Sequence, residues 1–538
     1  MKQAKTKATI GALATLISYV SLNSWAHAYH PEAFIWSPQD RENAEWVATS
    51  NSWLDRKACR WLGVCGGSHI HFSRQPNQAL VSHEPALKHP GSEGSDDWQN
   101  AWKEPTNTSK HWNKDEKTLR EIPEYVLEYA PLVHLFSGER YWPCDIAEHL
   151  YHVTPELNYT AIQSGSVHPA LTDLNKYNEY HGGGWVYLTS NDNPEEYPDW
   201  LGGQKNIPSV PEELKDDFSG NDGWVHRPGR TYLQGIKDVI ADMKEWFGSD
   251  SDSAADLKES ATAAKEYARL LLEQGYHQEL KRKTADEDPE GRLRGGRSEA
   301  PAVLIAIDKG HGVVDAFWFF FYSFNRGNSV FNVVFGNHVG DWEHTAIRFH
   351  HGEPKAVFFS EHNFGSAYSY DAVEKIGKRP VIYSATGSHA MYATPGLHPY
   401  VLPWGVLHDQ TDRGPLWDPT LNSHAFTYDF EKDILRASNI TPRAPTGWFH
   451  YAGRWGDKLY PLGDKRQYRF AGQYHYVSGP LGPKFKNLGR KKICGGPDRQ
   501  PCIIKHWLGG ESKIGRLQHK GEESDLYTEE ERHLGISQ

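Results

Sequence analysis

The sequence has no excess of positive charge and, beyond its N-terminus, no long uninterrupted hydrophobic run. Its 58 Lys and Arg residues stand against 69 Asp and Glu residues, which gives a formal net charge of −11. Such a chain offers no broad cationic surface, so we expect no binding to nucleic acid. The apolar run at 313–324 is interrupted by Asp315. We therefore expect no transmembrane helix after the N-terminal segment.

Cysteine is also scarce, with five residues in a chain of 538. Cys59 and Cys65 lie close together in the sequence. Cys494 and Cys502 form a second close pair. Two local disulfides are therefore the simplest pairing, with Cys144 left as a free thiol, although the spacing alone permits other connectivities.

The first 28 residues combine the parts of a secretory signal peptide. Lys2, Lys5 and Lys7 precede an apolar run at 8–22, and small residues at 26 and 28 fit a cleavage site. An uncleaved membrane anchor is the alternative, but the run is shorter than the roughly 20 apolar residues that span a bilayer. We therefore predict a secretory-pathway protein that ends in the extracellular space or the vacuolar lumen.

An oxidising compartment would suit both the paired cysteines and N-linked glycans. Three Asn-x-Ser/Thr sequons are candidate acceptor sites, at Asn107, Asn158 and Asn439. Each sequon is a weak signal alone, and together they agree with the signal peptide.

The sequence pattern indicates a mainly β fold, with an antiparallel β-sandwich-like core, irregular loops and an inserted helical arm. Short β-branched and aromatic runs separated by Gly, Asn and Pro recur at 124–153 and from Val303 onward. Residues 254–283 instead carry apolar side chains at helical spacing. The predicted order is a signal peptide at 1–28, an irregular N-terminal segment packed on the core at 29–120, a first β block at 121–247, a helical and charged insert at 248–300, a second β block at 301–480, and a Cys-containing C-terminal segment with a disordered tail at 481–538.

The stretch GNHVGDWEHT, at 336–345, concentrates imidazole and carboxylate groups within an apolar region. In a strand, Asp341 and Glu343 would project from one face, whereas Trp342 and His344 would project from the other. Two carboxylates on one face are costly to bury unless they share a cation, a proton or a polar ligand. This pattern predicts a polar site within the β core.

Two further histidines follow apolar strands, at the ends of FFSEH and in ATGSH. If these strand ends lie beside the GDWEH motif, their side chains would join one polar pocket. The predicted pocket residues are His338, Asp341, Glu343, His344, His362, Ser388 and His389. Histidines at strand ends are also often hydrogen-bonded core residues, which is the alternative to a ligand site.

The donor types suit a divalent cation such as Mg, Ca, Mn or Zn, with Asp341, Glu343 and His338 as its ligands. In the alternative, the carboxylates only accept backbone hydrogen bonds or pair with Arg348. No HExxH or GxSxG motif is present, and no nucleotide cofactor is expected. Ser388 and His389 are neighbours on the chain and would face opposite ways, so a catalytic Ser-His dyad between them is improbable.

Several long motifs occur in the order found in one family. FGNHVGDWEHTAIRF at 335–349 is followed by FFSEHNFG at 358–365 and RPVIYSATGSHAMYATPGLH at 379–398. These blocks resemble the vacuolar protein sorting-associated protein 62 family. The resemblance implies a role connected with delivery of proteins to the vacuole, and it supplies no catalytic activity.

A shorter resemblance concerns the GHRHDWE heptapeptide of the necrosis- and ethylene-inducing-peptide-like proteins, which are secreted β-sandwich cytolysins. His338, Asp341, Trp342 and Glu343 match that heptapeptide, but Gly340 stands where it has its second His. The resemblance implies a divalent cation that helps to bind a sphingolipid sugar headgroup.

Three functions remain open from the sequence. The first is a secreted or vacuolar-lumen protein that binds a glycan or polar lipid headgroup with the help of a metal. The second is a metal-dependent hydrolase that uses Asp341 and Glu343. The third is a lumenal trafficking or structural protein without a ligand pocket.

Overall fold

The computed structural model describes residues 37–70, 97–104, 109–162, 168–210, 295–330, 333–362, 364–399, 407–470, 472–496 and 501–508, with scattered residues between 17 and 35. Most of the predicted signal peptide lies outside these residues. So do Asn107, the tail from 509, and all of the predicted insert at 248–300 except its last six positions.

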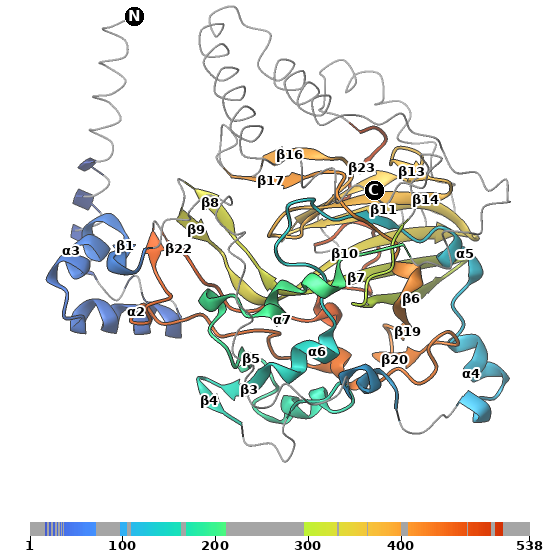
Figure 1. Cartoon of the computed structure of the whole chain (residues 1–538), viewed down its shortest axis with the longest axis horizontal. Helices are drawn as coiled ribbons and strands as arrows, with labels where there is room; N and C mark the ends of the chain where they lie inside the picture. The colour runs from blue at the N-terminus through green and yellow to red at the C-terminus, as the bar shows by residue number, and fades with distance from the viewer. Residues whose placement is uncertain are drawn as a thin grey trace, which may run out of the picture.

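An eight-stranded sheet forms the centre of the molecule (Figure 1), in the order β20-β19-β6-β7-β10-β11-β12-β23. Its neighbours pair antiparallel except at β6–β19 and β12–β23, which are parallel. The strands are β6 Ala302–Gly310, β7 Val313–Asn325, β10 His338–His350, β11 Glu353–Glu361, β12 Phe364–Ser369, β19 Ser423–Asp429, β20 Ile434–Ala437 and β23 Ile504–Lys505.

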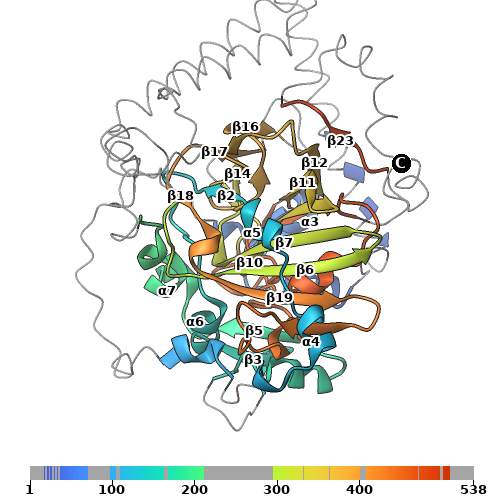
Figure 2. The same cartoon turned by 90° about the vertical axis from the view of Figure 1, so that its right-hand side faces the viewer.

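A smaller sheet packs against one face of the central sheet (Figure 2). Val133, Ile382 and Trp417 of this sheet share a buried core with Trp318 and Phe320 of β7. This packing gives the sandwich-like arrangement that the sequence predicts. The sheet contains β13 Lys375–Ile376, β14 Arg379–Ser384, β2 Leu132–His134 and β18 Leu416–Trp417, with β15 Met391–Tyr392 paired to β14.

The opposite face of the central sheet is covered by short helices and a three-stranded sheet (Figure 2). Leu150, Val186 and Trp448 from these elements pack with Phe319 and Trp342. The layer includes α6 Ile146–Tyr151, β3 Val153–Leu157, β4 Thr160–Ala161, β5 Val186–Ser190, α7 Asp199–Gly202 and the 3-10 helix η12 Gly447–His450. The central strands are therefore buried on both faces.

This double burial explains the composition of β7. Its side chains alternate between the two cores, with Phe317, Phe319 and Phe321 in one and Trp318 and Phe320 in the other. A strand covered on both sides needs apolar residues at successive positions, which gives a nearly continuous aromatic run. The strand pairs with β10 along almost its full length.

The remaining elements surround these layers, and several lie where the sequence pattern indicated irregular or purely β structure. The described part of residues 29–120 contains three α-helices, α2, α3 and α4. The elements are α2 Pro38–Thr49, α3 Trp53–Leu62, β1 Val64–Cys65, α4 Lys114–Leu119, α5 Glu124–Glu128, β8 Asn328–Val330, β9 Val333–Phe335, β16 Gly396–Pro399, β17 His408–Thr411, β21 Arg469–Phe470 and β22 Gln473–Tyr474.

Both predicted disulfides are confirmed. Cys59 is bonded to Cys65, and Cys494 is bonded to Cys502. Cys144 is a buried free thiol. Two of the predicted glycan acceptors, Asn158 and Asn439, lie on the surface, with Asn158 in the turn between β3 and β4.

Candidate functional site

Strand β10 presents the GDWEH motif with the alternation expected of a strand. Asp341 and Glu343 lie on the face toward the smaller sheet, whereas Trp342 packs in the opposite core. The two acidic residues are only 5% and 4% exposed. Burial of adjacent carboxylates at this depth requires partners that carry protons or positive charge.

The first partner is His389, which follows β14 and has a left-handed backbone conformation with φ 55°. Its Nδ1 lies 3.0 Å from Asp341 Oδ2, and its Nε2 lies 3.0 Å from the carbonyl oxygen of Tyr141. A carbonyl oxygen only accepts, so Nε2 carries a hydrogen. The contact between Nδ1 and Oδ2 then needs a second proton, which the His389–Asp341 pair must hold between them.

Glu343 has a different environment although it is two residues away. Its Oε2 accepts a hydrogen bond of 2.5 Å from Ser360 Oγ on β11. Burial, followed by the negative charge of Asp341, raises the pKa of Glu343 to about 8. The side chain is therefore largely protonated at neutral pH.

A second imidazole–carboxylate pair lies beside the first. His362 Nε2 is 2.7 Å from Asp409 Oδ2, and Asp409 also accepts hydrogen bonds from Ser388 and Tyr392. Burial alone would lower the pKa of His362, but the hydrogen bond to Asp409 and the charge of Asp409 raise it overall. Burial alone would raise the pKa of Asp409, but the hydrogen bond from His362 lowers it overall. The two groups form an ion pair.

His338 lies at the start of β10, and one of its ring nitrogens is hydrogen-bonded to the backbone. Nδ1 donates a hydrogen bond of 2.6 Å to the carbonyl oxygen of Gly340. Burial lowers the pKa of His338, although the charge of Asp341 partly opposes this. The neutral ring therefore carries its lone pair on Nε2. A backbone carbonyl on one nitrogen is the arrangement that commonly orients a metal-binding histidine.

Of the seven predicted pocket residues, the structure brings together Asp341, Glu343, His362, Ser388 and His389, whereas His338 lies at the start of the same strand and His344 is separated from them. The ring of His344 packs against Phe319 and Phe358 on the opposite face of β10. Burial lowers its pKa well below the usual range, and the charge of Arg490 adds to the effect. His344 belongs to the GDWEH motif and is therefore among the predicted pocket residues. It directly follows Glu343 on the strand, so its side chain points to the opposite face.

Several residues of this region could not be recognised from the sequence. Tyr322 lies opposite Asp341 on β7, and its ring stacks on His389 with centroids 3.7 Å apart. Glu139 accepts a hydrogen bond from the backbone N–H of Gly387 and so fixes the loop that carries His389. These contacts join segments far apart in the chain, and no local motif signals them. We call Asp341, Glu343, His362, His389 and Asp409 the polar cluster.

The surroundings of Gly340 explain why this chain has no His at the position of the second His in the cytolysin heptapeptide. Its φ is +70°, and a Cβ at this position would lie 1.8 Å from the carbonyl oxygen of Trp455. Gly456 is similarly placed against the carbonyl oxygen of Val339. Two backbones are thus in direct contact, and no side chain fits where the heptapeptide has its second His.

Three predicted cation ligands do not form a group in this structure. Among the described residues, no three His, Cys, Asp or Glu side chains are placed so that they could hold a metal ion. Asp341 and Glu343 offer hard oxygen donors and His338 offers a lone pair, so the chemical types suit a divalent cation. A cation site therefore stays a prediction based on donor type.

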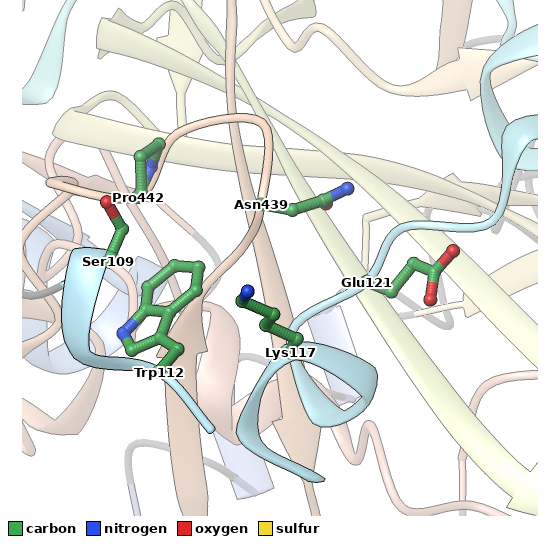
Figure 3. A pocket seen from close by; sticks show the side chains of 6 residues that line it. All are labelled: Ser109, Trp112, Lys117, Glu121, Asn439 and Pro442. Carbon is green, nitrogen blue, oxygen red and sulfur yellow. The ribbon is translucent and has the colours of Figure 1, made fainter. Parts of the chain in front are cut away.

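A separate open pocket of about 380 Å³ lies far from this motif in the sequence (Figure 3). It is formed between the region of α4 and the loop that follows β20. Its lining residues are Ser109, Trp112, Lys117, Glu121, Asn439 and Pro442. None of them belongs to the polar cluster.

Comparison with known proteins identifies the family. The family model described as "Vacuolar protein sorting-associated protein 62" matches residues 299–463, which include β10 and all five residues of the polar cluster. A Saccharomyces cerevisiae protein named "Putative vacuolar protein sorting-associated protein TDA6" is 35% identical over 421 residues, or 74% of this chain and 73% of the relative. The chain belongs to the vacuolar protein sorting-associated protein 62 family.

A second relative of this family member supports the same conclusion. "Vacuolar protein sorting-associated protein 62" of Saccharomyces cerevisiae is 32% identical over 413 residues, covering 71% of this chain and 69% of the relative. Both alignments are far longer than the match to the family model. The family resemblance inferred from the motifs is thereby confirmed.

Two solved structures have short overlaps with this family member. Necrosis and Ethylene inducing Protein 2, from the causal agent of cocoa's Witches Broom disease, is 17% identical over 18% of this chain and 46% of its own, with a TM-score of 0.15. The non-toxic HaNLP3 protein is 13% identical over 31% of this chain and 62% of its own, with a TM-score of 0.17. These scores are too low to indicate a common overall fold.

The described helices of this family member are short. In this part of the chain, none combines the length and the apolar character that crossing a bilayer requires.

Proposed function

We propose that this family member is a ligand-binding protein of the secretory pathway, with the vacuolar lumen as its destination, and that the polar cluster receives a hydroxyl-rich group from a glycan or a polar lipid headgroup. The names of both Saccharomyces cerevisiae relatives connect the family with vacuolar protein sorting. The disulfides and the predicted signal peptide agree with a lumenal location.

One observation carries the proposal. Asp341 and Glu343 are nearly buried side by side, yet each carboxyl group uses only one oxygen in the hydrogen bonds that the described residues make to it. The second oxygen of Asp341 is an acceptor, and that of Glu343 is one whenever its carboxyl group has lost its proton. Ligand hydroxyl groups are suitable donors for such acceptors.

A divalent cation forms the second part of the proposal. Asp341 and Glu343 would supply its oxygen ligands, with His338 as the predicted third donor. A bound cation would neutralise the paired carboxylates and attract oxygen atoms of the ligand. The chain's own contribution is to hold the two carboxylates in place through His389 and Ser360.

The metal experiment uses the protein purified from a eukaryotic host that processes its N-terminus. After incubation with excess Mg, Ca, Mn or Zn and removal of free ions, elemental analysis should find about one bound cation per chain. The Asp341→Asn/Glu343→Gln variant should lose it. Asp457→Asn is the matched control, because Asp457 is a buried carboxylate outside the cluster whose pKa is raised by burial to about 7.

The two parts of the proposal fail separately. If no preparation retains a cation, the metal assignment is wrong. If glycan arrays and headgroup-bearing vesicles bind the parent and the Asp341→Asn/Glu343→Gln variant equally, the polar cluster is a structural network. Turnover of a glycosidic or ester substrate that is lost in the variant would instead support the hydrolase alternative.

A further inference from the structure

Helix α3 exposes an apolar surface near the N-terminus. None of its ten residues is buried. Its four large apolar side chains remain extensively exposed: Trp53 62%, Leu54 69%, Trp61 44% and Leu62 55%. Together they present on the order of 500 Å² of apolar surface, which is a patch of the size that marks interaction sites.

The exposed helix is firmly attached to the body of the protein. Ser52 caps its N-terminus by accepting a hydrogen bond from the backbone N–H of Asp55, and Gly63 ends it in a left-handed conformation. The disulfide between Cys59 and Cys65 joins it to β1, which pairs with β21. The helix lies at one edge of the molecule beside β1 (Figure 1). Its apolar surface is thus held outward by the fold.

Basic side chains accompany the apolar ones. Lys57 Nζ lies 4.9 Å from the centre of the Trp61 ring, and Arg60 is exposed in the same turn of the helix. The only acidic residue of α3, Asp55, is engaged by the hydroxyl of Ser68. The helix therefore carries positive charge although the whole chain has a formal net charge of −11.

We propose that α3 is a membrane-docking helix that lies in the interface of a bilayer containing anionic lipid. Tryptophan combines an apolar ring with a polar N–H and is favoured at the boundary between headgroups and acyl chains. Lysine and arginine beside such a face interact with anionic headgroups while their stems cover apolar surface. Residues of both types are needed for this arrangement, and α3 carries both.

The area of the patch argues against a second copy of the chain as the occupant. A stable protein interface buries about 800 Å² on each partner, which exceeds what these four side chains present. Binding to a bilayer requires no such minimum buried area, because insertion of apolar side chains and electrostatic attraction both contribute to the binding free energy. The apolar run at 8–22 is the other candidate occupant, and it is removed if the signal peptide is cleaved.

Vesicle flotation tests this proposal with the protein purified from a eukaryotic host, after mass spectrometry has established its N-terminal residue. Vesicles of phosphatidylcholine with about 30% phosphatidylserine should carry the protein upward, and about 0.5 M salt should weaken this. The Trp53→Ser/Trp61→Ser variant should lower the bound fraction by about fivefold or more. Lys57→Ser/Arg60→Ser should reduce binding only to vesicles with anionic lipid.

Two controls separate docking from misfolding. Trp185→Ser removes a tryptophan that is 54% exposed on a different element, and binding should be unchanged. Trp53→Phe/Trp61→Phe keeps aromatic rings on α3 and should restore most of the binding. Equal flotation of the parent and the Trp53→Ser/Trp61→Ser variant, or no flotation of either, would overturn the proposal. A dimer in light scattering that the serine variant abolishes would assign the patch to a second copy and also overturn it.

Discussion

His389 and Asp341 are joined across 48 positions of sequence by a contact of 3.0 Å between Nδ1 and Oδ2. The same imidazole lies flat on the ring of Tyr322, with an angle of 1° between the planes. One side chain thus connects the loop after β14 with both long strands of the central sheet. The polar cluster is therefore part of the packing between the two sheets.

Replacement of His389 by alanine should be strongly destabilising. The change leaves a cavity beside Tyr322 and removes the hydrogen-bond partner of the buried Asp341. We expect the free energy of unfolding to fall by about 3–5 kcal/mol. Urea denaturation measures this, with the exposed His111→Ala as the control. A loss below 1 kcal/mol would show that the pair contributes little to the fold.

The pair formed by Asp315 and Arg348 should dominate stability at neutral pH. Arg348 Nε and Nη2 donate hydrogen bonds of 2.7 Å to the two carboxylate oxygens, and both side chains are buried. Arg348→Met would leave Asp315 without this partner, and we expect a loss of about 3–5 kcal/mol in unfolding free energy. Asp315→Asn/Arg348→Met, which removes both charges, should lose less.

The pH dependence of that loss has a definite sign. Burial alone would raise the pKa of Asp315, but Arg348 holds it below its usual value of 3.8. The resulting stability is present above the unfolded pKa and is lost as the pH falls through the folded pKa. The difference between the parent and Arg348→Met should therefore shrink below about pH 4. A constant difference from pH 7 to pH 3 would contradict this account.

The contribution of Glu343 to stability should have the opposite pH dependence to that of Asp315. Burial and the charge of Asp341 raise its pKa from 4.5 to about 8, so the folded chain binds a proton that the unfolded chain has released. Its contribution is present below pH 4.5 and declines as the pH rises toward 8. Glu343→Gln should therefore gain roughly 3–4 kcal/mol relative to the parent between pH 5 and pH 8. Denaturation curves at several pH values, in metal-free buffer, provide the measurement.

Gly340→Ala should be among the most damaging single substitutions in the motif. The new Cβ would meet the carbonyl oxygen of Trp455 and would also occupy a left-handed conformation. We expect a loss of about 3 kcal/mol or more in unfolding free energy. Gly377→Ala is the control, since Gly377 also has a positive φ of 59° but has open space around it. Equal effects of the two substitutions would assign the cost to backbone conformation alone.

The sequence predicted the parts of this site that follow from local periodicity. The alternation of β10 placed Asp341 and Glu343 on one face, and the positions of His362 and His389 at strand ends brought them to the same region. Asp409 could not be predicted, because it reaches His362 from β17 through a pairing of distant segments. The parallel pairing of β6 with β19 was missed for the same reason. The sequence signal for antiparallel pairing is a local turn that joins two strands, and no such turn joins β6 to β19.

Because Cys144 is buried, the folded protein should not react with thiol reagents. Desolvation raises the pKa of this thiol to about 12, and Sγ lies close to the carbonyl oxygens of Trp142 and Trp200. The reactive thiolate is therefore confined to open or unfolded molecules. The rate at which a thiol reagent labels Cys144 consequently reports how often the layer around α6 and α7 opens. Cys144 is therefore a natural reporter of this opening, and no cysteine has to be introduced.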